Sequence, residues 1–224
     1  MYSSLKMLVK YVTYWLTAAN GKGHGIHSPF VFQFVTDVLN DDRFFYAFET
    51  IEQLPHQQQG FKKYNQLLFK IVNYYQPKTV LYIDESITNT LFYLAQANNN
   101  TPVFSFVNNN SQQQKAVQIN PKIAIDNVYF YDDILAITTN QYHLVCINTY
   151  NEDDLQNYFQ LLLPHFTTQS IVIINNIHAS KQLEAIWYNL QQHSSITLSI
   201  DLFQLGLIFF RPENKIPQHF TIKF

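Results

Sequence analysis

Two kinds of hydrophobic spacing divide the chain at about residue 60. Before that point the pattern is helical or irregular, and the first apolar residues recur three or four positions apart, at Leu5, Leu8, Val9, Val12, Leu16 and Ala19. This spacing predicts an amphipathic helix. A second helix is expected to begin at Ser28-Pro29, because serine caps free N–H groups and proline fits the first helical position. We therefore expect a helical extension over residues 1–60.

After residue 60, strand-like and helical patterns alternate. Short apolar runs predict strands at 79–84, 103–107, 128–131, 143–148 and 170–175. Helical patterns are found at 61–75, at 86–97, from about 111, at 153–163 and at 180–193. The last three runs, at 196–200, 205–210 and 220–224, have no helix between them. Strand–helix repeats imply a mostly parallel sheet covered on both faces, and the helix-free ending implies an antiparallel edge. The fold class is therefore α/β, with one sheet domain over residues 61–224.

Composition limits the classes of partner. The net charge of −2 leaves no basic stripe, so nucleic acid is not an expected partner. A single cysteine, Cys146, excludes an intramolecular disulfide and suits a cytoplasmic protein. No apolar stretch is long enough to span a membrane. The first helix is expected to pack on the sheet domain, and a peripheral membrane contact through it is the less favoured alternative.

Four segments are candidates for a ligand site. In open α/β sheets, ligands bind beyond the carboxyl ends of the strands, which nominates residues 84–89, 107–109, 148–151 and 175–178. A further candidate is the stretch 21–27, which holds three of the five glycines and so needs unusual backbone dihedrals or close approach. Its His24 and His27 have no neighbouring acid or cysteine cluster to complete a metal site. We treat them as pocket residues and expect no metal.

Three motifs resemble those of a known family. They are His24-Gly-Ile-His-Ser-Pro-Phe-Val31, Asn176-Ile-His-Ala-Ser180 followed by Trp187, and the ending from Ile200 to Phe224. Together they are similar to a group of class I S-adenosylmethionine (SAM)-dependent methyltransferases with an N-terminal helical region. The resemblance covers nearly the whole chain. It implies a Rossmann-like sheet and a SAM site at the strand ends, although a shared fold does not by itself carry function.

The sequence departs from that family where SAM would bind. The stretch Tyr82-Ile-Asp-Glu-Ser-Ile-Thr-Asn-Thr90 has no glycine, whereas the family has an acidic, glycine-rich turn there. The candidate cofactor residues that remain are Asp84, Glu85, Ser86, Asn89 and, after the second strand, Asn108. Asn108 or Val107 stands where an acid would accept the ribose hydroxyls. Losing such a charged hydrogen bond weakens binding by about ten- to a hundredfold.

The fourth and fifth strand ends depart in the same way. They read Asn148-Thr-Tyr-Asn151 and Asn175-Asn-Ile-His178, where the family commonly has acids. Amide oxygens are weaker ligands for Mg²⁺ than carboxylates, which again argues against a metal. We expect Asn148, Tyr150, Asn175 and Asn176 to line the pocket. His178 is a candidate general base, with a structural hydrogen-bonding role as the alternative.

Three functions are compatible with these patterns. The favoured one is a methyltransferase-like pseudoenzyme whose degraded site makes SAM chemistry weak or absent. Such a protein would act as a binding or regulatory module, with an oligomer of this chain or an unknown protein or small molecule as partner. The second is an active SAM-dependent methyltransferase with a rebuilt pocket and a small-molecule acceptor. The third is a binder of another small ligand.

Overall fold

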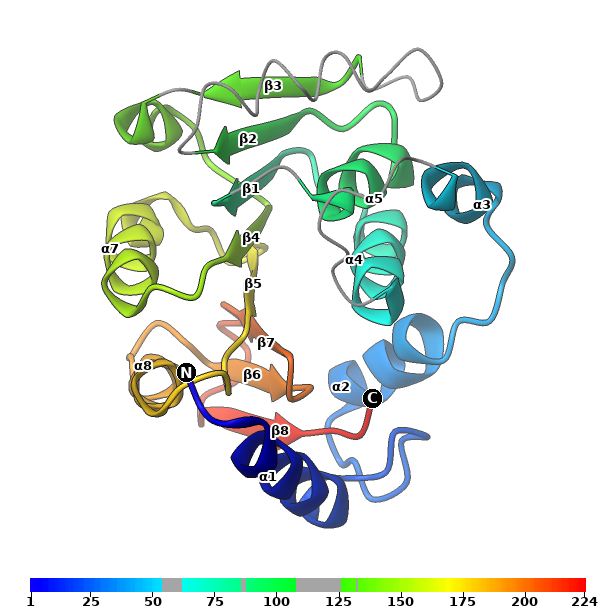
Figure 1. Ribbon diagram of the computed structural model, residues 1–224, viewed down its shortest axis with the longest axis vertical. Helices are drawn as coiled ribbons and strands as arrows, with labels where there is room; N and C mark the ends of the chain where they lie inside the picture. The colour runs from blue at the N-terminus through cyan, green and yellow to red at the C-terminus, as the bar shows by residue number, and fades with distance from the viewer. Residues whose placement is uncertain (54–61, 86–87, 108–125, 132) are drawn as a thin grey trace.

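The computed structural model describes residues 1–53, 62–85, 88–107, 126–131 and 133–224, and within them a single sheet organises the chain. Its strands are β1 (Val80–Asp84), β2 (Val103–Val107), β3 (Val128–Tyr131), β4 (Leu144–Asn148), β5 (Ile171–Asn175), β6 (Leu198–Asp201), β7 (Leu205–Phe209) and β8 (Gln218–Thr221). The strand order is β3-β2-β1-β4-β5-β7-β6-β8 (Figure 1). The pairs among β1 to β5 are parallel, and β7 runs antiparallel to both β5 and β6. The predicted α/β class, with its antiparallel edge, is confirmed.

Helices cover both faces of the sheet. One face carries α4 (Lys62–Tyr75) and α5 (Asn89–Ala97), with α2 (Pro29–Phe34), the π-helix η1 (Val35–Leu39) and α3 (Tyr46–Glu52) beside them (Figure 1). The other face carries α7 (Glu152–Leu162) and α8 (Lys181–Gln191). Each face has its own apolar core cluster, because successive strand residues point to opposite sides.

Several helices begin at a side-chain cap, and the cap predicted at Ser28 is confirmed. The Ser28 side chain accepts a hydrogen bond from the Val31 amide at the start of α2, with proline at the first helical position. The Ser180 hydroxyl caps α8 in the same way through the Leu183 amide. For α7 the cap is Asn151, and the helix begins at Glu152, one residue before the predicted start at 153. These side chains satisfy amides that have no partner within the helix.

Other boundaries differ from the predictions. The last strand is Gln218–Thr221 rather than 220–224, because the chain then leaves β6 to pair with Ala19 through Ile222. The helix predicted from residue 86 begins at Asn89, and the polar helix predicted from residue 111 lies outside the described residues. The sequence patterns also did not predict α3 or the two short 3₁₀ segments at Ile134–Thr139 and Leu163–His165 as separate elements.

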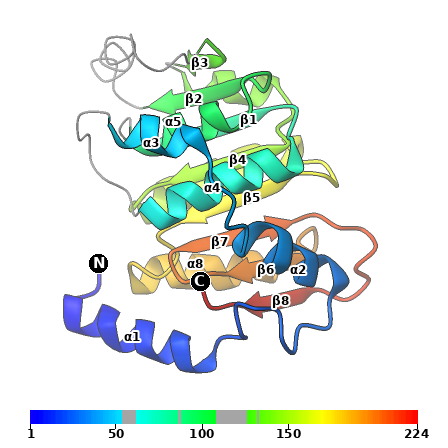
Figure 2. The same ribbon diagram turned by 90° about the vertical axis from the view of Figure 1, so that its right-hand side faces the viewer.

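The helical extension shares the core of the sheet domain. Val31, Phe34, Val35 and Val38 are fully buried in the cluster that includes the β1 side chains Val80 and Tyr82. The first helix, α1 (Ser4–Thr17), lies apart from the others along the β8 edge of the sheet (Figure 2). None of the helices in the described ranges is long and apolar enough to cross a bilayer. The boundary at residue 60 stays a prediction, since residues 54–61 are not described.

Candidate functional site

The carboxyl ends of β1 and β4 meet at one edge of the sheet. The strand register pairs Asp84 at the end of β1 with Val107 of β2 on one side and with Asn148 of β4 on the other. Asn175 ends the neighbouring strand β5. Three of the four nominated segments therefore converge here. The fourth also reaches this edge at Val107, but Asn108 lies outside the described residues.

Asp84 is buried and hydrogen-bonded on one carboxylate oxygen. Its Oδ2 accepts from the Tyr82 hydroxyl, from Thr88 Oγ1 at 3.3 Å and from Asn148 Nδ2 at 2.7 Å. The Tyr82 hydroxyl and the Thr88 hydroxyl are themselves 2.7 Å apart. Burial, followed by the neighbouring Asp84 carboxylate, raises the pKa of Tyr82 well above its usual value. Tyr82 is therefore a neutral hydrogen-bond donor to Asp84 at physiological pH.

From Asn148 the hydrogen bonds continue across the strand ends. Asn148 Oδ1 accepts from Asn175 Nδ2 at 2.8 Å and from Asn176 Nδ2 at 3.2 Å. The amide oxygens of Asn175 and Asn176 both accept from Gln204 Nε2, at 3.0 Å in the case of Asn175. Asn176 holds a left-handed backbone conformation with φ of 63°, which asparagine tolerates better than most residues. We call the set Asp84, Asn148, Asn175, Asn176 and Gln204 the amide network.

The remaining predicted cofactor residues lie beside this network. Glu85 is exposed, and its Oε1 accepts from Thr149 Oγ1 at 3.0 Å and from the Tyr150 amide at 3.5 Å. Tyr150 is also exposed, at 47%. Asn89 is half-buried as the first residue of α5. Ser86, the other candidate cofactor residue of this turn, lies outside the described residues.

The described side chains at these strand ends bond mainly to one another. In Asp84, the one described acid that is buried here, Oδ2 already accepts three hydrogen bonds, and the amides beyond it bond to one another. No group of three His, Cys, Asp or Glu side chains with metal-binding geometry occurs in the described part of the chain.

His178 lies at the same edge but in a separate cluster. Its Nδ1 is 2.8 Å from Glu184 Oε1, and its Nε2 is 2.8 Å from Asp201 Oδ2. The imidazole stacks on Phe203 with 5.3 Å between the ring centroids. Burial lowers the pKa of His178, but the hydrogen bonds to the two carboxylates outweigh burial and raise it above its ordinary value. In the protonated ring both nitrogens donate to carboxylates, which leaves no lone pair to accept a further proton.

His178 therefore fits the structural hydrogen-bonding role better than the catalytic one. The cluster extends to α1, because Glu184 also accepts from Lys10 Nζ at 2.7 Å and from the Tyr2 hydroxyl at 2.8 Å. Burial raises the pKa of Glu184, and hydrogen bonds from Lys10, Tyr2 and His178 more than offset it and lower that pKa overall. A cavity of about 370 Å³ lies between α1 and this cluster.

His24 and His27 are not part of the amide network. Both are exposed in the loop between α1 and α2, and none of the hydrogen bonds described for the network involves them. The loop is shaped by Gly23 and Gly25, which have φ values of 88° and 81°. Asn40 Nδ2 also donates to the Gly21 carbonyl at 2.7 Å, which holds the loop against the end of η1.

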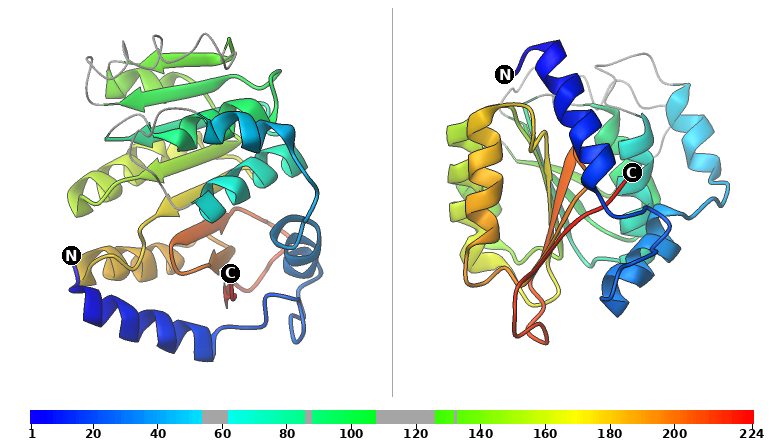
Figure 3. Two further views of the ribbon diagram at one scale, coloured as in Figure 1. Left: turned by 45° about the vertical axis from the view of Figure 1, so that its right-hand side comes forward. Right: turned by 90° about the horizontal axis from the view of Figure 1, so that it is seen from below.

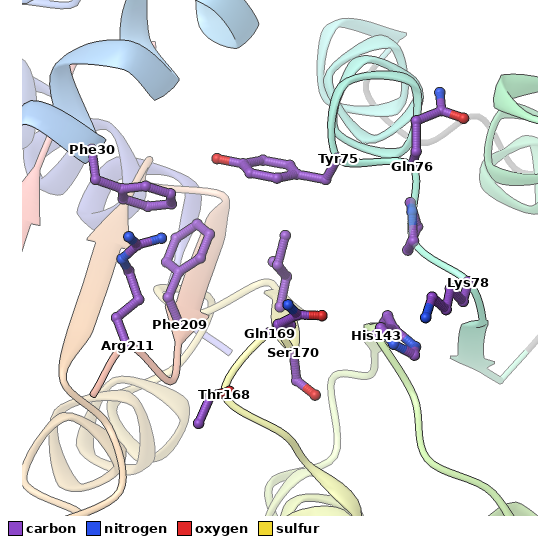
Figure 4. A pocket seen from close by; sticks show the side chains of 12 residues that line it. Phe30, Tyr75, Gln76, Lys78, His143, Thr168, Gln169, Ser170, Phe209 and Arg211 are labelled. Carbon is purple, nitrogen blue, oxygen red and sulfur yellow. The ribbon is translucent and has the colours of Figure 1, made fainter. Parts of the chain in front are cut away.

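A second cavity, of about 320 Å³, lies at the opposite, amino-terminal edge of the sheet (Figure 4). Phe30, Tyr75 and Phe209 form its apolar wall, and Lys78, His143 and Arg211 bring basic groups to it. The Arg211 guanidinium lies 3.9 Å from the centre of the Phe30 ring. Sequence reasoning missed this cavity because its residues come from five separate segments that carry no shared motif.

Comparison with known proteins identifies the fold. No family model matches the sequence, and no curated protein matches it either. Solved structures do match. The O-methyltransferase TomG from Streptomyces achromogenes, in complex with SAM, has a TM-score of 0.60 and 16% identity over 75% of this chain and 91% of its own. The SAH-bound methyltransferase PaMTH1 from Podospora anserina has a TM-score of 0.61 and 12% identity over 94% and 97%. An O-methyltransferase from Bacillus cereus in complex with SAH has a TM-score of 0.58 and 13% identity, over 80% of this chain and 96% of its own. The chain therefore has the Rossmann-like α/β fold of these methyltransferases.

Proposed function

We propose that this protein is a methyltransferase-fold scaffold with weak or absent SAM chemistry, acting as a binding or regulatory module. The observation that carries the proposal is the amide network. It uses the side chains that would otherwise face a cofactor at the ends of β1, β4 and β5 to hydrogen-bond to one another.

Binding SAM at these strand ends would break existing hydrogen bonds. A ligand amino group could reach Asp84 Oδ2 only in competition with Tyr82, Thr88 and Asn148. Leaving a buried donor without a partner costs about 1–3 kcal/mol per group. Each 1.4 kcal/mol is about a tenfold loss of affinity, so two displaced donors would weaken binding by roughly a hundredfold.

Isothermal titration calorimetry with SAM and with S-adenosylhomocysteine tests the proposal. We expect no binding, or dissociation constants above roughly a hundred micromolar. The same titrations on Asn148→Ala, which opens the network without adding charge, show whether the network limits binding. Wild-type binding tighter than tens of micromolar for either ligand would contradict the proposal.

One observation favours the alternative of an active enzyme with a rebuilt pocket. Glu85 and Tyr150 are exposed beside each other at the strand ends and leave a charged carboxylate and an aromatic ring available to a ligand. A screen for transfer of a labelled methyl group from SAM to small hydroxylated acceptors tests this reading. Transfer that disappears in Glu85→Gln but persists in Asn99→Asp, an exposed control, would establish it.

A further inference from the structure

The first helix packs on the domain through one narrow side. Tyr14 and Ala18 are its buried residues, and with Met7 they pack against Phe203. The Tyr14 hydroxyl donates to the Ile222 carbonyl, and Lys10 reaches Glu184. This contact side is not the apolar stripe seen in the sequence. The helix was expected to pack on the domain, and it does, but through different residues.

The apolar stripe faces away from the protein. At about 3.6 residues per turn, Leu5 lies on the side of α1 opposite Tyr14. The outward side chains are between 48% and 73% exposed: Leu5, Leu8, Val9, Val12, Trp15 and Leu16. Surface helices normally present polar residues to solvent, whereas α1 presents apolar residues. Figures 2 and 3 show α1 at the outer rim of the molecule, beyond the β8 end of the sheet.

Positive charge accompanies the stripe. The first 36 residues contain Lys6, Lys10 and Lys22 and no Asp or Glu, in a chain whose net charge is −2. Lys6 lies on one flank of the stripe, with its Nζ 4.2 Å from the centre of the Tyr2 ring. On the other flank, the Lys223 Nζ lies 4.5 Å from the centre of the Trp15 ring. Lys10 is paired with Glu184, whereas Lys6 is exposed and Lys223 is half-buried beside the stripe.

We propose that α1 is a peripheral membrane-binding helix that lies in the surface of an anionic lipid bilayer. An apolar face bordered by lysines and bearing a tryptophan is the composition that binds at such interfaces. Charge distinguishes this partner from a second copy of the chain. A symmetric pair of α1 ridges would bring two positively charged surfaces together, whereas anionic headgroups complement such a surface. A single helix also offers little area for a stable dimer, which needs about 800 Å² from each partner.

Vesicle binding tests the proposal with a built-in reporter. The chain has two tryptophans, and only Trp15 is exposed, because Trp187 is fully buried. Vesicles of phosphatidylcholine with phosphatidylglycerol are expected to sediment the protein and to shift its tryptophan emission to shorter wavelength. Phosphatidylcholine vesicles should bind at least roughly tenfold less, and high salt should release the protein. In Trp15→Phe the emission shift should vanish while sedimentation persists.

Two variants and their controls isolate the surface. Leu5→Ser combined with Leu16→Ser should weaken vesicle binding by at least roughly tenfold, because two apolar contacts with the bilayer are lost. Lys6→Glu should weaken binding to anionic vesicles alone by roughly tenfold. The matched controls, Leu135→Ser with Ile216→Ser, remove exposed apolar side chains elsewhere and should bind as the wild type does. All variants should keep the wild-type thermal midpoint, since each side chain is exposed.

The proposal fails if the wild-type protein does not associate with anionic vesicles at low salt. It also fails if analytical ultracentrifugation shows a dimer that the Leu5 and Leu16 substitutions dissociate, because the stripe is then an interface between copies. Equal loss of binding in the control variants would likewise overturn the assignment to α1.

Discussion

Replacing Asn148 by aspartate is the sharpest test of the amide network. The change keeps the size and shape of the side chain but exchanges an NH₂ donor for a carboxylate oxygen. In the wild type that donor lies 2.7 Å from Asp84 Oδ2. The variant therefore loses a hydrogen bond to a charged acceptor and brings two carboxylates into contact beside the buried Tyr82.

The cost can be bounded from these contacts. Losing a hydrogen bond to a charged group costs about 1.5–3 kcal/mol. Two unit charges about 4 Å apart repel by about 4 kcal/mol at an effective dielectric constant of 20. The pair can escape the repulsion by taking up one proton, which costs at most about 4 kcal/mol at pH 7 for an aspartate with an ordinary pKa of about 3.9. We expect Asn148→Asp to lower the free energy of unfolding by about 2–4 kcal/mol at neutral pH.

Urea unfolding at pH 5 and at pH 8, with EDTA present, measures this effect. The second carboxyl has a raised pKa in the folded variant, so its penalty is absent below the unfolded pKa, grows between the unfolded and the folded pKa, and is complete above the folded pKa. The loss of stability should therefore be larger at pH 8 than at pH 5. Asn99→Asp is the control, because Asn99 is exposed and the substitution should change stability by less than about 0.5 kcal/mol. Equal stability of the two variants at pH 8 would refute the contact between Asn148 and Asp84.

Three further predictions concern residues around the site. His178→Gln should remove a stabilising contribution of the protonated histidine. That contribution is complete below the unfolded histidine pKa of about 6.5 and is lost as pH rises through the raised folded pKa. Urea unfolding from pH 5 to 9 should therefore show a smaller loss of stability at the alkaline end. Gly206→Ala should destabilise the fold by about 1–3 kcal/mol, because the added Cβ would lie 2.5 Å from a Trp187 ring carbon, and Trp187→Leu in that background should recover part of the loss in a double-mutant cycle. Cys146 should react with a thiol reagent only under unfolding conditions, because burial raises the pKa of its fully covered thiol.

The strand–helix framework could be predicted because it depends on local patterns. The run Leu144–Asn148 is apolar at successive positions, which is typical of a strand buried on both faces. Ser28 marks a helix start through side-chain capping that acts within one turn. These features need no knowledge of distant residues, and the structure confirms them.

Contacts between distant segments could not be read in the same way. The sequence nominated Asn148 and Asn175 as ends of strands, but their mutual hydrogen bond depends on sheet register and side-chain rotamers. Gln204 was missed altogether, because it lies in the turn between β6 and β7, which the strand-end rule does not cover. For α1, the spacing of apolar residues marked a stripe without showing which side of the helix meets the domain. The side that meets the domain is set by contacts with Phe203 and Glu184, about 170 or more residues away in the sequence.

The amides at the strand ends act as one coupled set because an amide both donates and accepts. Asn148 donates to Asp84 through Nδ2 and accepts from Asn175 and Asn176 through Oδ1. An aspartate at 148 could not donate, and an aspartate at 175 could not donate to Asn148. Acids at both positions would leave facing carboxylates with no proton between them unless a cation or a ligand intervened. A chain of amides needs neither, so these strand ends hydrogen-bond to one another without a cation or a ligand.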